Sequence, residues 1–97
     1  MQIEFETDVF RWESRADLWC FGAVPVDLSD LIRELPLAPR GFGSVPVEVR
    51  IEHVSWRTSV FPNSDGRFVF AIKKSVRDAL GIGLGDTVTV ELATIGV

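Results

Sequence analysis

A small, mainly β domain with two short helices is the fold that this sequence predicts, arranged as a closed or half-closed barrel in the order β-β-α-β-β-β-α-β. Three observations lead to it. Apolar and polar residues alternate with period two over most of the chain, as they do in half-buried strands. Apolar residues at helical spacing occur in only two short segments. The strand-like segments follow one another through short, turn-rich connections, which favours hairpins over a parallel sheet.

Length and composition are those of one globular domain covering residues 1–97, with 46% hydrophobic and 25% charged residues. No apolar run approaches the roughly 20 residues that span a bilayer, so no membrane partner is expected. The acidic residues near the start are unlike a signal peptide, and a single cysteine fits a reducing compartment. We therefore expect a cytoplasmic protein, with monomer and homodimer both left open.

The first two strands are expected on either side of a polar stretch. Residues 2–12 alternate, with a break near Asp8 that separates Ile3 and Phe5 from Phe10 and Trp12. Residues 13–17 are polar and indicate a turn. The short run over residues 18–24 is apolar and rich in aromatic residues, which predicts a more buried strand.

The first helix is expected after Pro25. Asp27 is suited to cap its first turn. One apolar stripe results from residues at i, i+3, i+4 and i+7, namely Leu28, Leu31, Ile32 and Leu35, and Ser29 lies off it. Pro36 and Pro39 end the helix because proline lacks the N–H and restrains the residue before it. Residues 36–44 then form the longest loop.

The clearest local signal is a hairpin over residues 45–61, with its turn at Glu52-His53. In that register every pair on one face is largely apolar, and Glu48 faces Arg57 on the other face. A turn one residue later would instead set Arg50 against Arg57, so the first register is favoured. Neither Glu52 nor His53 favours the positive φ of a tight primed turn.

The last third of the chain predicts a turn, a strand, a helix and a strand. Residues 62–66 are dense in turn formers, and residues 68–73 alternate again. A second helix over residues 75–80 would open at Ser75, with Asp78 in a capping box and with Val76, Ala79 and Leu80 facing inward. Gly81 suits the left-handed position after a helix, and residues 87–92 form the last strand. No internal repeat is visible in the sequence.

Catalytic and metal-binding patterns are scarce. His53 is the only histidine and is expected as an exposed turn residue, and Cys20 is expected as a buried small hydrophobe. A structural zinc site takes four Cys or His ligands, and the chain offers two. The glycine-rich stretches at residues 41–44 and 81–86 follow the wrong elements for phosphate loops and indicate turns. No catalytic residue, metal or cofactor is therefore expected, and we expect no enzyme activity.

A binding site is the functional hypothesis that the aromatic residues support. Trp12, Phe42 and Phe61 fall outside the predicted inward faces, and together they would form an apolar patch or cleft. Phe42 stands between two glycines in the 36–44 loop, where Arg40 would add a contact to an acidic ligand or peptide. In the alternative, Phe42 plugs the barrel end as permanent core. The hypothesis is a non-catalytic module that binds a small ligand or a protein.

Two segments carry a resemblance to a known family: residues 24–27, Val-Pro-Val-Asp, and residues 74–81 with 85–88, Lys-Ser-Val-Arg-Asp-Ala-Leu-Gly and Gly-Asp-Thr-Val. Over about residues 4–93 the chain resembles the bacterial domain-of-unknown-function family DUF1905. The resemblance implies a double-split β-barrel, a fold shared with swapped-hairpin transcription factors of the AbrB and MazE type. It implies no reaction, because none is assigned to the family.

The fold relatives raise DNA binding as the rival function. The cations that would contact DNA are Arg50, Arg57, Arg67, Lys73, Lys74 and Arg77. Nucleic-acid binders need a basic stripe to neutralise phosphates. Here 14 acidic residues outnumber 10 basic ones, the net charge is −4, and acids lie beside the candidate cations. We therefore expect no nucleic-acid partner.

Overall fold

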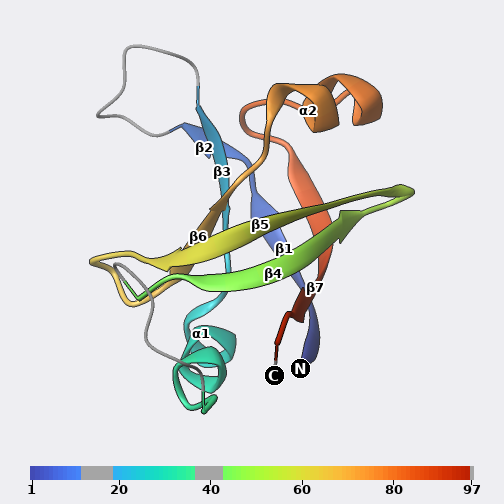
Figure 1. Ribbon diagram of the computed structural model, residues 1–97. Coiled ribbons are helices and arrows are strands. Elements are labelled where there is room, and N and C mark those ends of the chain that lie inside the picture. Colours follow the sequence, from blue (N-terminus) through green and yellow to red (C-terminus); the bar gives the residue numbers. More distant parts are fainter. Residues whose placement is uncertain (12–18, 37–42, 97) are drawn as a thin grey trace.

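The first predicted strand is divided in the structure, a computed structural model that describes residues 1–11, 19–36 and 43–96. The strands and helices of these residues follow the predicted order (Figure 1). They are β1 (Gln2–Asp8), β2 (Phe10–Arg11), β3 (Cys20–Ala23), α1 (Val26–Arg33), β4 (Val45–Ile51), β5 (Val54–Pro62), β6 (Phe68–Ala71), α2 (Lys74–Leu80) and β7 (Thr87–Thr94). The division falls at Val9, next to the predicted break, where the chain bends between β1 and β2.

The strands form one curled antiparallel sheet in the order β1-β7-β4-β5-β6-β3-β2. Its two end strands, β1 and β2, are successive parts of one bent strand, so the sheet returns on itself as a barrel. Val9 keeps its backbone bonded at the bend, because its N–H donates to the Asp86 carbonyl at 2.8 Å and its carbonyl accepts the Gly85 N–H at 2.9 Å. β5 likewise changes its pairing partner along its length. It pairs first with β4 and then, at Phe61 and Pro62, with β6.

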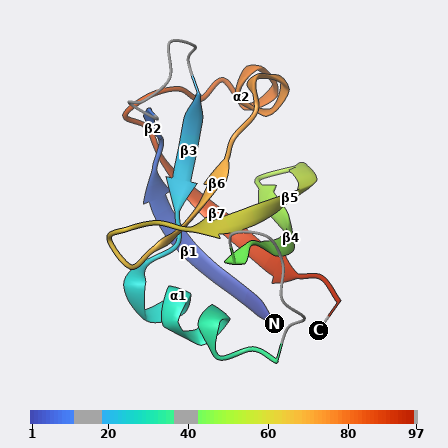
Figure 2. The same ribbon diagram turned by 60° about the vertical axis from the view of Figure 1, so that its left-hand side comes forward.

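The two halves of the chain share one topology, although their sequences show no repeat. Each half consists of a strand that pairs with two different neighbours, then a short strand, a helix and a further strand. The first half is β1-β2, β3, α1 and β4, and the second half is β5, β6, α2 and β7. Exchanging the halves turns β1–β7 into β5–β4 and β2–β3 into β5–β6, and it leaves the β3–β6 and β4–β7 pairings in place. Reciprocal backbone bonds mark the centre, Val24 N–H to Phe68 O and Ile72 N–H to Cys20 O, both 2.8 Å. The helices lie at opposite ends of the barrel (Figures 1 and 2).

The predicted hairpin register is confirmed. Ile51 faces Val54, Val49 faces Trp56 and Glu48 faces Arg57 across β4 and β5. Trp56 is buried, as the register requires. Glu48 and Arg57 form an exposed pair at 3.8 Å. In the turn, Glu52 has a φ of 54°, which is a left-handed conformation that glutamate disfavours.

The barrel interior is built from the inward-facing residues of all the longer strands, and its largest fully buried side chain is Phe70 on β6. The Phe70 ring lies against Gly22 of β3, so closely that a Cβ on Gly22 would come within 2.6 Å of Phe70 Cζ. Phe5 packs edge-on against the same ring, with centroids 6.2 Å apart. A glycine in β3 is therefore what lets the central aromatic ring cross the strand.

The prediction for the inward face of α1 is wrong in part. Ile32 is buried and Leu28 half-buried, but Leu31 is 44% exposed, and Ser29 is fully buried instead. The Ser29 hydroxyl donates to Val24 O and accepts the Phe68 N–H, both at 3.0 Å. A buried N–H needs an acceptor, and Ser29 supplies one only when this side of the helix faces β6, which turns Leu31 outward. Asp27 is not the cap either, since the helix follows Pro25 with no side-chain cap.

The second helix begins one residue earlier than predicted, at Lys74, and has no side-chain cap. Asp78 therefore takes no part in a capping box and instead pairs with Lys74. Val76 is buried as predicted, whereas Ala79 is exposed. Gly81 adopts φ 65° directly after the helix, which confirms its predicted left-handed position.

Candidate functional site

Apolar side chains cover the outer face of the short strands β2, β3 and β6, as well as their inner face. Two rows cross this outer face, Phe10–Phe21–Ala71 and Ala23–Val69–Phe61, and neighbours in each row are register partners. We call these six residues, with Trp19, the aromatic face. Its centre is buried, at Phe21, Ala23 and Val69, whereas Trp19 and Phe61 at its two ends are 41% and 42% exposed.

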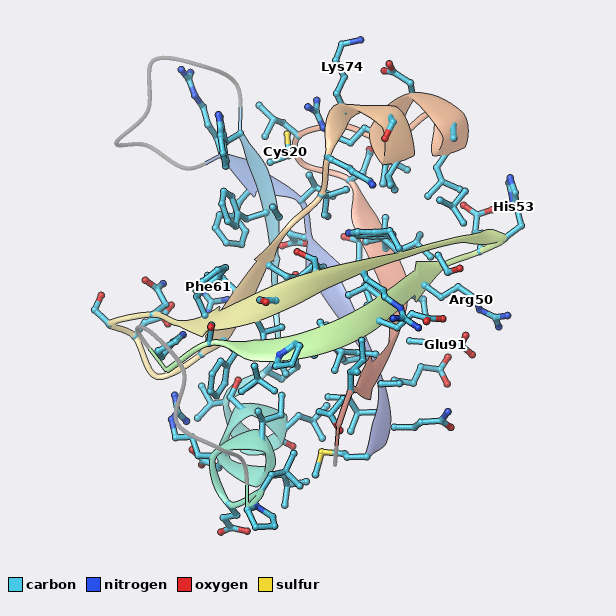
Figure 3. All side chains as sticks on the ribbon, viewed as in Figure 1. Cys20, Arg50, His53, Phe61, Lys74 and Glu91 are labelled. Atoms are coloured by element: carbon cyan, nitrogen blue, oxygen red, sulfur yellow. The ribbon has the colours of Figure 1, made fainter. Side chains whose placement is uncertain are left out.

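Of the predicted site residues, the structure places Phe61 at one end of the aromatic face (Figure 3). Gly43, the first described residue after residues 37–42, lies next to the end of β5, since a Cβ on Gly43 would be 3.4 Å from Pro62 Cγ. Trp12, Arg40 and Phe42 themselves lie outside the described residues. Their clustering with Phe61 stays a prediction.

At the other end of the aromatic face lies a shallow depression of about 250 Å³, which sequence reasoning did not single out as a site. We call it the cationic depression. Its lining residues come from the start of β3 and the residue before it, from the end of β6, from the connection to α2 and from α2 itself: Trp19, Cys20, Ala71, Ile72, Lys73, Lys74 and Arg77. The Trp19 ring stacks on Phe21, with centroids 6.3 Å apart and planes 19° apart. Cys20 and Lys74 mark this end of the molecule in Figure 3.

Three cations line the depression, and each is held differently. Arg77 Nε donates to Ile72 O at 3.2 Å, which holds the guanidinium against the segment between β6 and α2. Lys74 Nζ lies 2.8 Å from Asp78 Oδ2. The hydrogen bond from Lys74, with the charges of Lys74 and Arg77, lowers the pKa of Asp78 from its ordinary 3.8. Lys73 is exposed. The lining therefore carries more positive than negative charge in a chain whose net charge is −4.

The equivalent end of the first half shows that this charge comes from sequence rather than topology. Ser29 has the position in α1 that Arg77 has in α2, since each side chain donates to the carbonyl five residues before it. There, Pro25 and Val26 stand where the second half has Lys73 and Lys74. Lys73, Lys74 and Arg77 thus carry charge at positions where the first half has the uncharged Pro25, Val26 and Ser29.

The other candidate cations for DNA binding are dispersed. Arg50 on β4 pairs with Glu91 of β7 at 2.6 Å, and Arg57 pairs with Glu48 on the same outer face. This face belongs to the part of the sheet formed by the long strands β1, β7, β4 and β5, which we call the large sheet. Arg67 pairs with Asp65 at 2.6 Å in the turn between β5 and β6. Of the six, the structure brings together only Lys73, Lys74 and Arg77.

His53 and Cys20 lie where the sequence predicts. His53 is exposed at the hairpin tip, away from the labelled Cys20 and Lys74 in Figure 3, and Cys20 is buried. Among the described residues, no three His, Cys, Asp or Glu side chains gather where they could hold a metal ion. No described helix has the length and apolar character to cross a membrane.

Residues 5–92 match the family model described as domain of unknown function DUF1905. The chain belongs to the DUF1905 family. The match confirms the resemblance seen in the sequence, and it takes in every residue that lines the cationic depression. DUF1905 is an uncharacterised domain. No curated protein is detectably similar in sequence to this DUF1905 chain.

Proposed function

We propose that this DUF1905 domain is a non-catalytic binding module that holds a small anion with an aromatic or apolar group in the cationic depression. The observation that carries the proposal is the juxtaposition of the half-exposed Trp19 ring with Lys73, Lys74 and Arg77 around one hollow. Such a mixture of apolar surface and a few charged groups is typical of small-molecule sites. A single cysteine supports a reducing, cytoplasmic compartment for the module.

The volume and the charge of the depression limit the kinds of ligand that it could hold. A hollow of about 250 Å³ is smaller than the roughly 300–1,000 Å³ of drug-sized sites, so it suits one ring with an acidic group. The ring of the ligand would stack on Trp19, and its anionic group would meet ammonium or guanidinium donors. Contacts this exposed are weak, and a dissociation constant in about the millimolar range is expected.

A matched pair of probes tests the proposal on the full chain. Phenyl phosphate carries a ring and a dianion, whereas benzyl alcohol carries the ring alone. In ¹H–¹⁵N spectra, phenyl phosphate should shift the Trp19 indole and the amides of Ile72 to Asp78, and added salt should weaken the effect. Lys73→Gln should lower the affinity about two- to fivefold.

The control variant is Arg57→Gln, which removes the same charge from the outer face of the large sheet. It should leave the affinity almost unchanged. Equal shifts with benzyl alcohol would contradict the proposal, as would shifts confined to other surfaces or equal losses in the two variants.

A further inference from the structure

One of the cations that line the cationic depression, Lys74, is paired with a carboxylate beside it, which bears on how strongly the depression holds an anion. Lys74 and Asp78 lie one helical turn apart on α2, with Nζ 2.8 Å from Oδ2 and side chains 79% and 64% exposed. A carboxylate of the chain itself therefore already engages one of the three lining cations. Lys73 and Arg77 are the other two.

The equivalent aspartate in the first half pairs in the opposite direction. Asp30 follows Ser29 in α1 as Asp78 follows Arg77 in α2. Asp30 pairs with Arg33 at 2.9 Å, toward the end of its helix, whereas Asp78 pairs back toward the start of α2, at the depression. The competing pair is thus particular to the α2 end, because Lys74 stands where α1 has Val26.

We propose that Asp78 is a specificity-determining residue of the cationic depression, acting as an internal competitor for the anion. This inference rests on the proposed function. An anion that binds Lys74 must share its ammonium with the Asp78 carboxylate or displace that carboxylate, and the carboxylate also repels the incoming charge. Because that repulsion grows in proportion to the ligand charge, Asp78 weakens the binding of a dianion more than that of a monoanion.

The competition is present at neutral pH. The hydrogen bond from Lys74 is the largest cause that lowers the pKa of Asp78 below 3.8, and the charges of Lys74 and Arg77 lower it further. Asp78 is therefore ionised at any pH well above 3.8, and its charge does not change between about pH 6 and pH 8. Binding measured in that range reports the competition with Asp78 fully charged.

Asp78→Asn tests the inference, because it removes the charge and keeps the shape. The probes are benzoate, a monoanion, and phenyl phosphate, a dianion at pH 8. The variant should bind benzoate about twofold more tightly and phenyl phosphate about fourfold more tightly than the wild type. Adding Lys74→Gln should cancel the gain, so that the double variant returns close to wild-type affinity.

Asp30→Asn is the matched control, since it changes the net charge equally at the other helix, and it should leave both affinities almost unchanged. ¹H–¹⁵N spectra check that each variant is folded. An Asp78→Asn variant that binds no more tightly, or gains equally for both anions, overturns this inference and leaves the proposed function standing. A wild-type protein that binds neither anion at the depression overturns both.

Discussion

At Gly22 the absence of a side chain lets the ring of Phe70 cross β3 in the middle of the barrel. The Phe70 ring is fully buried, and Phe5 packs against it from another strand. Thr7 Cγ2 would lie 3.0 Å from a Cβ on the same glycine. The side-chain volume at this one position thus limits how closely β3, β6 and β1 approach.

Gly22→Ala should therefore destabilise the fold by about 1–3 kcal/mol through overpacking. Gly83→Ala is the control, because Gly83 has open space around it and no positive φ, and it should be neutral or stabilising by up to about 1 kcal/mol. Urea denaturation followed by tryptophan fluorescence measures both free energies of unfolding. Equal values for the two variants would mean that Phe70 does not lie against β3.

On the scale of elements, the hydroxyl of Ser29 decides which side of α1 faces the barrel. The helix spans Val26–Arg33, and its buried residues are Ser29 and Ile32. Arg33 also attaches α1 to the chain at the start of β6. Its guanidinium donates to Gly66 O at 2.6 Å and lies 5.0 Å from the centroid of the Phe68 ring. Hydrogen bonds to the start of β6, rather than the leucine stripe, therefore decide which side of α1 faces the barrel.

Ser29→Ala should lower the free energy of unfolding by about 1–3 kcal/mol, because the Phe68 N–H would be left without its acceptor. Leu31→Ala should cost no more than about 0.5–1 kcal/mol, because Leu31 is half-exposed. Thermal or urea unfolding of the two variants ranks these effects. A larger loss for Leu31→Ala would restore the leucine stripe as the buried face.

Across the whole molecule, the charges are arranged unevenly. The outer face of the large sheet carries Glu4, Glu6 and Asp8 on β1 beside the paired Arg50 and Arg57. The cations of the depression lie around α2 instead, at one end of the barrel. A long run of DNA phosphates would meet acidic residues beyond that one cluster, and four of the six candidate cations already have carboxylate partners.

Weak, non-specific binding to duplex DNA is therefore expected. The logarithm of the binding constant should fall with the logarithm of the salt concentration at a slope for no more than about two phosphates. Fluorescence anisotropy with a labelled duplex, between about 50 and 200 mM salt, measures the slope. A slope for about six or more phosphate contacts would contradict the expectation and favour an AbrB-like or MazE-like regulator.

Short stretches of sequence by themselves determined most of the fold. The period-two alternation gave the strands, the pairing of Glu48 with Arg57 gave the hairpin register, and Gly81 gave the end of α2. The family motifs are equally local. Tertiary structure alone decided which side of α1 is buried, because the acceptor that Phe68 needs comes from Ser29, 39 residues away. It likewise decided that Trp19 joins Lys73, Lys74 and Arg77, since the pairing of β3 with β6 brings them together. Such contacts depend on strand pairing and polar satisfaction between distant segments, which periodicity within one segment cannot encode.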